Sequence, residues 1–490
     1  MPLPDVIEIG PLPGPVRAEI TVPGSKSITN RALVLAALAE GDTALRGALW
    51  SEDTQVMVDC LRALGFGVQV EADAEEACNR TIRVRGLAGA IPRSGTREKP
   101  LELFVGNAGT AARFVAALVC LGNGVYRLHG VQRMHERPQE SLFEALRQLG
   151  YQIDSPNDRL PAIIHGAGPS GKMCRVSISE SSQFASALLL AATRGGWHVE
   201  MAGENEEESP YVSMTSKMIE AFPKCGGVFP IEADASSGSY FWAAAHWEIL
   251  EWKEGAAGAE SRNGSISIRP TVMVLRWPRS GWQIDASFHT HFLKMILNSP
   301  NFEFEGSAID PEQKRQRAQR AEAWKESHMQ NAATDAARNL VSDQRTFSRR
   351  SDLGDSIMTA IVMAPLATLP TRFADLGRLR LQECERILAL RTELAKCGAK
   401  VIEERDTLTV FPSSLHGAEI ETYQDHRMAM CFAILGLKVP GIRIKNPVCV
   451  KKTFPNFFQK LAAPPPHGLG ATLRDCATGR TLEVGELFAE

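Results

Sequence analysis

The sequence lacks the motifs of common metal, nucleotide and hydrolase sites. Its ten cysteines form no CxxC pair and no metal-like pairing with histidine, which favours reduced thiols in a cytoplasmic protein over a disulfide framework. No GxxxxGK[ST] loop is present, which excludes a Walker nucleotide site, and no HExxH or GxSxG motif supports metal-dependent hydrolysis or a serine nucleophile. The sequence therefore implies no cofactor and no metal.

An excess of charge of one sign and a long apolar run are missing too. Lys and Arg number 54 against 57 Asp and Glu, so no global field favours nucleic acid or an anionic membrane. The longest apolar run, residues 357–369, is too short to span a bilayer and contains Pro365. Residues 1–15 show no signal or transit pattern. We expect no membrane and no nucleic-acid partner, and any bound anion must be held by local clusters of basic residues.

The chain is long enough for two or three domains, with 490 residues of which 44% are hydrophobic. One pattern recurs, in which an amphipathic helix ends at a glycine and is followed by an alternating strand. It occurs over residues 60–68 and 145–153, and weaker copies end at Gly226 and Gly398. The recurrence predicts a repeated α/β unit rather than a doubly wound sheet, although helix, glycine and strand are also how ordinary α/β proteins connect their elements.

The composition changes between residues 247 and 351. Residues 311–350 are rich in charge and in helix formers, which predicts a solvated helical insertion with little core of its own. Its basic residues are interleaved with acidic ones, which favours a solvated surface over contact with nucleic acid.

Two glycine-containing segments lead into apolar helical runs. In residues 21–31, Gly24 lets backbone N–H groups approach an anion at a helix N-terminus, while Lys26 and Arg31 supply charge; an ordinary helix cap followed by surface basic residues fits equally well. In residues 104–113, Gly109 leaves room for a ligand against the backbone. Residues 133–138 place two arginines in a predicted loop, where they either bind an anion or are simply solvated.

Three later segments carry further polar candidates. Residues 181–183 either cap a helix or bind a phosphate. Asp355 precedes a buried-looking segment, as a helix cap or as a base. If residues 382–394 are helical, Glu383 and Arg386 share a face at i, i+3 spacing, which a structural ion pair would also explain.

Together these segments resemble the 5-enolpyruvylshikimate-3-phosphate synthase family. The resemblance extends from Thr21 to about Leu461, apart from residues 247–351. The segments that carry it, in chain order, are residues 23–27 (PGSKS), 106–110 (GNAGT), 136–138 (ERP), 234–237 (DASS), 425–430 (DHRMAM) and 452–455 (KTFP).

The resemblance implies a two-domain inside-out α/β barrel, each domain built from three βαβαββ repeats. The N-terminal domain would comprise residues 21–232, on the shikimate 3-phosphate side. The C-terminal domain would comprise residues 1–20 and 233–490, with the charged insertion around 247–350. The chain would cross between the domains near Thr21 and near Glu232. The substrates would bind in the cleft between the domains, which would close around them. We expect the protein to be a monomer and to lie in the cytoplasm.

The resemblance also implies the site residues and the reaction, the transfer of the enolpyruvyl group of phosphoenolpyruvate to the 5-hydroxyl of shikimate 3-phosphate. Shikimate 3-phosphate would contact Lys26, Ser27, Arg31, Ser181, Ser182, Gln183, Asp355 and Gln382. Phosphoenolpyruvate would contact Lys26, Asn107, Gly109, Arg137, Gln183, Arg386, Arg427 and Lys452. Asp355 would take the proton of the 5-hydroxyl. Glu383, with Lys26 nearby, would protonate the methylene carbon and must then stay protonated near neutral pH.

Four departures from the family pattern affect details. Glu208 stands where the family usually has a serine three residues before the tyrosine, so that Ser209 would have to supply the phosphate contact. Gln382 replaces a lysine, and Arg378 an asparagine found in many members, which affects contacts to the shikimate ring. Phe114 replaces a proline expected to fix the start of the helix after the glycine loop, which predicts reduced sensitivity to glyphosate, a ligand of the phosphoenolpyruvate site in the family.

Two other functions compete with this interpretation. An enolpyruvyl transferase acting on UDP-N-acetylglucosamine shares the fold, but it normally carries a cysteine on a mobile loop, and residues 133–138 contain none. A non-catalytic anion-binding homologue would use the charged insertion as a partner surface; the retention of Asp355 and Glu383 argues against it.

Overall fold

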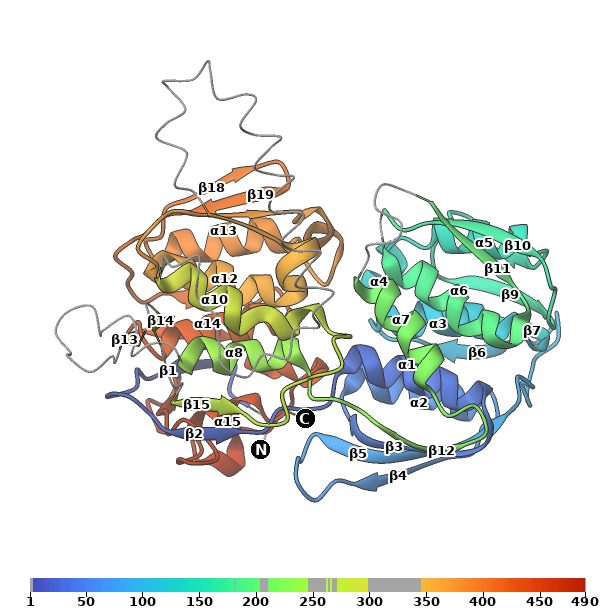
Figure 1. The fold of residues 1–490 in the computed structure, drawn as a ribbon, viewed down its shortest axis with the longest axis horizontal. Coiled ribbons are helices and arrows are strands. Elements are labelled where there is room, and N and C mark those ends of the chain that lie inside the picture. Colours follow the sequence, from blue (N-terminus) through green and yellow to red (C-terminus); the bar gives the residue numbers. More distant parts are fainter. Residues whose placement is uncertain are drawn as a thin grey trace, which may run out of the picture.

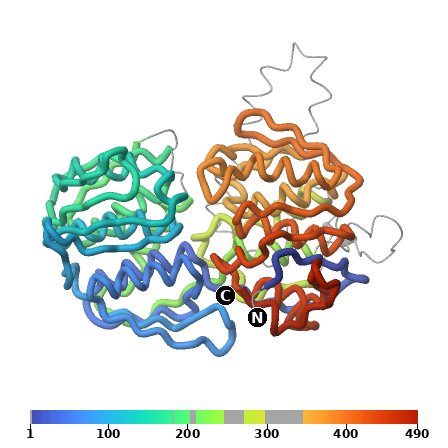
Figure 2. Tube along the Cα trace, turned by 180° about the vertical axis from the view of Figure 1, so that it is seen from behind, coloured from blue at the N-terminus to red at the C-terminus, as the bar shows by residue number. Residues whose placement is uncertain are grey.

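The computed structural model describes residues 3–179, 181–202, 210–245, 261–262, 265–266, 271–297 and 345–489. These residues form two lobes that lie side by side, each with its own hydrophobic core (Figure 1). One core runs from Ile28 to Ile231. The other combines residues 3–22 with residues from Tyr240 onward. The first strand consequently lies inside the lobe formed by the end of the chain, as Figure 2 shows from behind.

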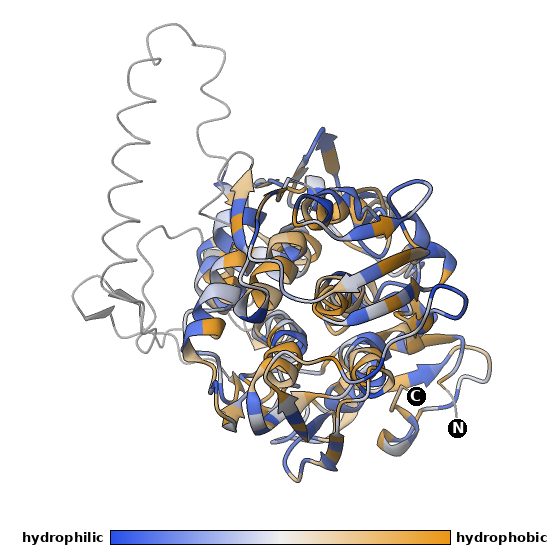
Figure 3. Ribbon diagram, turned by 90° about the vertical axis from the view of Figure 1, so that its right-hand side faces the viewer, coloured by the Kyte–Doolittle hydropathy of each residue, from blue (hydrophilic) through white to orange (hydrophobic). Residues whose placement is uncertain are grey.

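Helices fill the interior of each lobe and strands lie at its periphery (Figures 1 and 3). Several helices are apolar on nearly all sides, so that they must be surrounded by protein. All residues of α3 and α8 are buried, as are those of α1 from Ile28 onward. The helices of the first lobe are α1 (Lys26–Leu38), α2 (Glu52–Ala63), α3 (Gly109–Val119), α4 (Gln132–Glu136), α5 (Glu140–Gln148), α6 (Ser182–Gly195) and α7 (Pro210–Ala221). Those of the second are α8 (Ala235–Ala245), α10 (Phe288–Leu297), α12 (Ile357–Met363), α13 (Arg386–Lys396), α14 (His426–Gly436) and α15 (Phe457–Ala462).

Four sheets share one topology, in which a parallel pair is extended by two antiparallel strands. In the first lobe they are β12 (Gly227–Pro230), β3 (Glu40–Leu49), β5 (Asn79–Leu87), β4 (Val68–Ala72), and β6 (Leu101–Phe104), β7 (Asn123–His129), β9 (Ala162–Ala167), β8 (Gln152–Asp154). In the second they are β16 (Arg345–Ser348), β17 (Thr371–Ala374), β19 (Thr407–Val410), β18 (Val401–Glu404), and β20 (Glu419–Ile420), β21 (Ile442–Lys445), β1 (Val6–Ile9), β22 (Leu473–Asp475).

Three two-stranded pairs complete the described strands. Two are parallel, β10 (Met173–Ser177) with β11 (His198–Ala202) and β15 (Val272–Val274) with β2 (Ala18–Ile20). The third is antiparallel, β13 (Ser261–Arg262) with β14 (Ser265–Ile266). The predicted order of helix, glycine and strand is found at all four sites. Gly65, Gly150, Gly226 and Gly398 each have a positive φ, between 78° and 95°, which glycine adopts without steric cost.

The two segments that cross between the lobes pair with each other. Gly24 forms an antiparallel bridge with Ala233, and Ser25 N donates to the carbonyl oxygen of Glu232 at 2.8 Å. Gly24 packs so closely that an added Cβ would lie 2.0 Å from the carbonyl oxygen of Gly47. Glycine is therefore needed here for packing between backbones.

A charged insertion is expected around residues 247–350, with a solvated helical part at residues 311–350, but the segments that the structure describes in full there belong to the second lobe. Residues 271–297 belong to the second core, where Phe288 and Phe292 are buried on α10, and Arg345–Ser348 is a strand of its sheet. Apolar residues at helical spacing in α10 pack into the core, although the neighbouring sequence is rich in charge. Most of residues 311–350 lie outside the described residues.

Candidate active site

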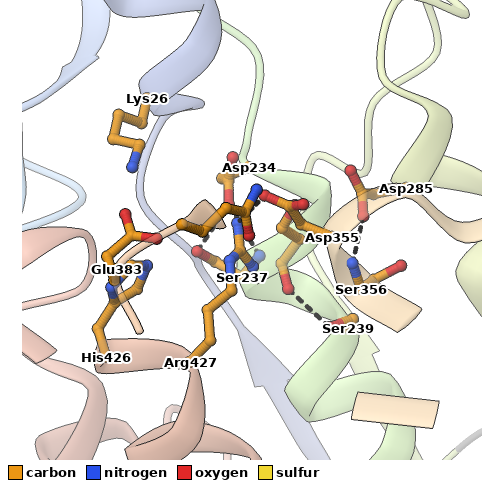
Figure 4. A network of polar contacts seen from close by, with 12 residues as sticks. Lys26, Asp234, Ser237, Ser239, Asp285, Asp355, Ser356, Glu383, His426 and Arg427 are labelled. Atoms are coloured by element: carbon orange, nitrogen blue, oxygen red, sulfur yellow. Dashed lines mark hydrogen bonds and ion pairs between the residues drawn. The ribbon is translucent and has the colours of Figure 1, made fainter. Parts of the chain in front are cut away.

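One cavity lies between the two lobes, and both contribute to its wall. Lys26, Ser27, Arg31, Gly109, Arg137, Ser182 and Gln183 line it from the first lobe, and Asp355, Gln382, Glu383, Arg386 and Arg427 from the second. Figure 4 shows Lys26 and Glu383 on one side of Arg427 and Asp355 on the other. Of the predicted site residues, Ser181, Asn107 and Lys452 do not line the cavity but lie next to residues that do.

Lys26 begins α1 and points at a carboxylate. Its Nζ lies 3.1 Å from Oδ2 of Asp53, which is buried in the first turn of α2 and lines the cavity. Nothing in the sequence marked Asp53 as a site residue, because an acidic residue in the first turn of a capped helix is common for local reasons. Two N–H groups of this segment are not available to an anion: Gly24 N donates to Asn79 Oδ1, and Ser25 N donates to the carbonyl oxygen of Glu232.

Arg31 is buried, and its guanidinium donates hydrogen bonds to uncharged groups. Nε donates to Thr215 Oγ1 at 2.7 Å, and a terminal nitrogen donates to Ser186 Oγ at 3.0 Å. Burial lowers the pKa of Arg31 to about 10, so that the guanidinium remains charged at neutral pH. Its Cζ lies 5.3 Å from the centre of the Phe114 ring, in cation–π range. Phe114 is the sixth residue of α3, so the expectation that this position fixes the helix start is wrong.

The glycine loop gathers cations from both lobes around the carbonyl oxygen of Asn107. Arg137 donates to it at 3.1 Å, and Lys452 Nζ lies 3.4 Å away. A Cβ added to Gly109 would lie 2.7 Å from terminal nitrogens of Arg113 and Arg137, so this glycine leaves room for the two guanidinium groups. Residues 132–136 form the short helix α4 where a loop was predicted, and Arg137 follows directly after it.

The hydroxyl residues that start α6 divide their roles. Ser181 Oγ accepts from Gln183 N at 3.2 Å and so caps the helix. Ser182 Oγ instead accepts from Arg378 of the other lobe. Gln183 Oε1 is buried without a hydrogen-bond partner among the described residues. Glu208 and Ser209 lie outside the described residues.

Glu383 is surrounded by cations. Its carboxylate oxygens lie 3.2 Å from Lys452 Nζ and 2.8 Å from a terminal nitrogen of Arg386. Burial raises the pKa of Glu383, but Lys452, Arg386 and Arg137 together bring that pKa well below its usual value. This direction is opposite to the expectation that Glu383 stays protonated near neutral pH, because the surrounding cations outweigh burial. The helix predicted over residues 382–394 begins only at Arg386, and the Glu383–Arg386 ion pair forms nonetheless.

Asp355 forms a second ionic centre. It lies in the short 3-10 turn η4 (Gly354–Ser356) and receives Arg349 at 2.5 Å and Arg427 at 3.2 Å. Burial raises its pKa, but Arg427 and Arg349 hold the pKa far below the ordinary value. The carboxylate makes ion pairs and does not cap the following helix α12. Asp355 is thus ionised at neutral pH.

Asp425 holds two of the predicted arginines in place. It accepts from Arg386 Nε at 2.6 Å and from the same guanidinium again at 3.1 Å. It also caps α14 by accepting from Arg427 N at 2.9 Å. Beside it, burial and Lys26 lower the pKa of His426, which is therefore neutral in the cavity wall.

A second buried acid, Asp285, was not singled out from the sequence. It lines the cavity, accepts from Ser356 N at 2.6 Å and thereby supports the turn that carries Asp355 (Figure 4). Burial, with the negative charge of Asp355, raises the pKa of Asp285 to about 6. Residues 271–297 lie in the stretch that the resemblance to the family does not cover, so nothing in the sequence indicated this acid.

Among the described residues, no three His, Cys, Asp or Glu side chains are grouped to hold a metal ion, and no helix is long and apolar enough to cross a membrane.

Comparison with known proteins gives one consistent result. The family model for EPSP synthase (3-phosphoshikimate 1-carboxyvinyltransferase) matches residues 12–248 and 349–461. The 3-phosphoshikimate 1-carboxyvinyltransferase of Trichormus variabilis is 34% identical over 478 residues, which cover 93% of this chain and 98% of the relative. That of Opitutus terrae is 35% identical over 481 residues, covering 94% and 98%.

Two solved structures share the fold. EPSP synthase from Acinetobacter baumannii superposes with a TM-score of 0.58 at 19% identity, covering 96% of this chain and 99% of that one. The enolpyruvyl transferase NikO from Streptomyces tendae superposes with a TM-score of 0.60 at 15% identity, covering 99% and 100%. The family predicted from the sequence is confirmed: this chain belongs to the EPSP synthase family.

Proposed function

We propose that this chain transfers the enolpyruvyl group of phosphoenolpyruvate to the 5-hydroxyl of shikimate 3-phosphate, with release of phosphate, in the shikimate pathway. One observation carries the proposal beyond family membership. Five cations from both lobes, Lys26, Arg137, Arg386, Arg427 and Lys452, converge on one cavity or its immediate border. Two substrates that together carry several negative charges need such a set of fixed cations to lie side by side away from water.

The two substrates would occupy opposite parts of the cavity. Phosphoenolpyruvate would bind between Arg137, Arg386, Arg427 and Lys452, near Lys26, Asn107, Gly109 and Gln183. Shikimate 3-phosphate would bind along the N-termini of α1 and α6, with Lys26, Ser27, Arg31, Ser181, Ser182 and Gln183, and reach Asp355 and Gln382. The lobe made of residues 21–232 would hold most of shikimate 3-phosphate, and residues 1–20 and 233–490 would supply the catalytic carboxylates.

The carboxylates would handle the protons as follows. Phosphoenolpyruvate brings negative charge to Arg137, Arg386 and Lys452 and so offsets their effect on Glu383. Burial then dominates and favours the protonated acid. Glu383 would give its proton to the methylene carbon, while Asp355 accepts the proton of the attacking 5-hydroxyl.

The addition forms a bond from the 5-oxygen to the central carbon of phosphoenolpyruvate and gives a tetrahedral intermediate. Elimination returns the methyl proton to Glu383, breaks the bond to the phosphate oxygen and restores the double bond. The released phosphate takes up the proton that Asp355 holds.

The finer architecture is part of the proposal. Three βαβαββ units in each lobe would be consistent with the sheet topology that occurs four times and with the helix, glycine and strand order. We expect a monomer as the working unit, and the free cysteines suit a reducing cytoplasm.

Phosphate release by the purified protein tests the function. We expect release that requires both shikimate 3-phosphate and phosphoenolpyruvate, with an enolpyruvyl product seen by mass spectrometry. Asp355→Asn should reduce kcat by about 100-fold or more, since it removes the proposed base. Release with UDP-N-acetylglucosamine but not with shikimate 3-phosphate would overturn the assignment, as would the absence of turnover with both acceptors. Size-exclusion chromatography with light scattering tests the monomer.

A further inference from the structure

Both oxygens of the Asp355 carboxylate accept hydrogen bonds from arginines. Oδ1 accepts from Arg349 at 2.5 Å, and Oδ2 accepts from Arg427 at 3.2 Å. A general base must come within hydrogen-bond reach of the proton that it takes. In the state that the structure shows, the two guanidinium groups therefore compete with an acceptor hydroxyl for this carboxylate.

The two arginines differ in the other partners that they can bind. Arg427 is one of the cations proposed to bind phosphoenolpyruvate. Among the described residues, Arg349 forms an ion pair with Asp355 and with no other acid, and its buried Nε has no hydrogen-bond partner there. The side chain of Arg349 is 6% exposed, against 10% for that of Arg427. An anionic substrate would thus draw Arg427 away from Asp355 and leave Arg349 in place.

Local hydrogen bonds fix the backbone at Arg349, which begins the π-type turn η3 (Arg349–Leu353). Ser348 Oγ accepts from the first N–H groups of this turn at 3.0 and 3.1 Å. Ser348 N donates to Asp352 Oδ2 at 2.8 Å, and Ser287 Oγ donates to the carbonyl oxygen of Asp352 at 2.6 Å. The base of the Arg349 side chain is therefore held in place by its own turn, as a positioning residue requires.

Asp355 needs a cation that stays because it is buried. Burial raises the pKa of Asp355, and Arg427 and Arg349 hold that pKa far below its ordinary value. The neighbouring Asp285 shows the effect of burial where cations offset less of its cost, since its pKa is raised to about 6. Without Arg349, the move of Arg427 to phosphoenolpyruvate would let burial favour the protonated form of Asp355, which cannot act as a base.

Further charged or titratable side chains surround Asp355 and its two arginines. They are Asp285 of η2 (Ile284–Ser287), Asp234 and Tyr240 of the α8 segment, Tyr211 of α7, Arg378 of η6 (Gly377–Leu381) and Arg386 of α13. Helix α12, which follows the turn of Asp355, has no titratable side chain. Arg386 pairs with Asp425 and Glu383, and Arg378 donates to Ser182, so that within the described residues Arg349 is the cation bonded to Oδ1.

We propose that Arg349 is a positioning residue for the base: it stays on Oδ1 of Asp355, keeps the carboxylate charged and oriented once phosphoenolpyruvate has drawn Arg427 away, and leaves Oδ2 to take the proton of the acceptor hydroxyl. The inference rests on the proposed function and adds a residue to it. Asp355 then becomes available only when phosphoenolpyruvate is bound, so that the acceptor hydroxyl is not deprotonated without its reaction partner.

The pH dependence of kcat tests the charge of Arg349. Arg349→Gln and Arg349→Met both remove this charge, and they differ in polarity, so that one folded variant is enough. Loss of a cation next to a carboxylate raises its pKa by about 1 to 3 pH units. The ratio of variant to wild-type kcat should therefore be at least about tenfold lower at about pH 6 than at about pH 9. Both KM values should change by less than about threefold.

Three controls separate this role from a structural one. Arg349→Lys keeps the charge, so its kcat ratio should differ by less than about threefold between the two pH values. Arg350→Gln removes a positive charge from an exposed residue of the same turn and should leave kcat unchanged at both. Because Asp285 titrates in the same range, each variant is also measured in an Asp285→Asn background, where the dependence on pH should persist.

The outcomes distinguish the two proposals. If the wild type does not turn over shikimate 3-phosphate and phosphoenolpyruvate, the proposed function and this inference both fail. If the wild type is active and a neutral variant, folded by circular dichroism, has a kcat ratio that does not depend on pH, only the role of Arg349 is overturned. A pH dependence that Arg349→Lys shares with the neutral variants would also overturn it, since the charge would then not be the cause.

Discussion

Replacement of Asp285 by Asn should stabilise the protein at neutral pH and leave its stability in acid unchanged. Asp285 is buried beside Asp355, and Arg427 offsets only part of the cost of its charge. The pKa of Asp285 is about 6 in the folded protein, against an ordinary value of 3.8. The difference corresponds to about 3 kcal/mol. Asn keeps an oxygen that can accept from Ser356 N, so that the turn beside it survives.

The direction of the pH dependence is set by whether the folded or the unfolded state binds the proton of Asp285 more tightly. The folded state does, so the stability linked to this proton is fully present below about pH 4 and is lost as the pH rises through about 6. Above pH 7 the wild type carries the whole cost and Asp285→Asn carries none. Urea unfolding at several pH values should show a difference in the free energy of unfolding that grows from near zero at about pH 3 to about 3 kcal/mol at about pH 8.

The Asp355→Asn protein provides a background that tests why the pKa of Asp285 is raised. In an Asp355→Asn protein the gain from Asp285→Asn should be smaller, because the charge of Asp355 is one of the causes that raise the pKa of Asp285. A variant that is destabilised at pH 8, or a gain that does not depend on pH, would refute the reasoning.

Three further substitutions probe the site. Glu383→Gln should abolish the entry of solvent deuterium into the methylene carbon of phosphoenolpyruvate and leave substrate binding nearly intact; unaltered exchange would exclude Glu383 as the acid. Phe114→Leu removes the ring beside Arg31 and should raise KM for shikimate 3-phosphate by about three- to tenfold in steady-state kinetics; an unchanged KM would show that the ring contact has no role in binding. Gly109→Ala places a methyl group 2.7 Å from the Arg137 guanidinium, so KM for phosphoenolpyruvate should rise more than KM for the other substrate, and an equal rise in both would contradict this geometry.

The sequence predicted well those features that depend on neighbouring residues. The helix, glycine and strand order could be read directly, because a helix end that needs a positive φ selects glycine within a few positions. The basic residues of the cavity could also be predicted, since each lies in a short and distinctive sequence motif. The start of α13 was misplaced by four residues because Glu385 caps it through its side chain, which the apolar pattern does not reveal.

Which charges meet was decided only by the tertiary structure. Lys26 pairs with Asp53, Arg386 with Asp425, and Asp285 with the backbone N–H of Ser356, although these partners are 27 to 71 positions apart. The protonation of Glu383 depends on the distances to Lys452 and Arg386, because electrostatic energy falls with separation and rises with burial. The sequence by itself thus determined the family, the local elements and the supply of cations. The fold determined their partners, and with them which carboxylates are ionised, because distance and burial exist only once the chain has folded.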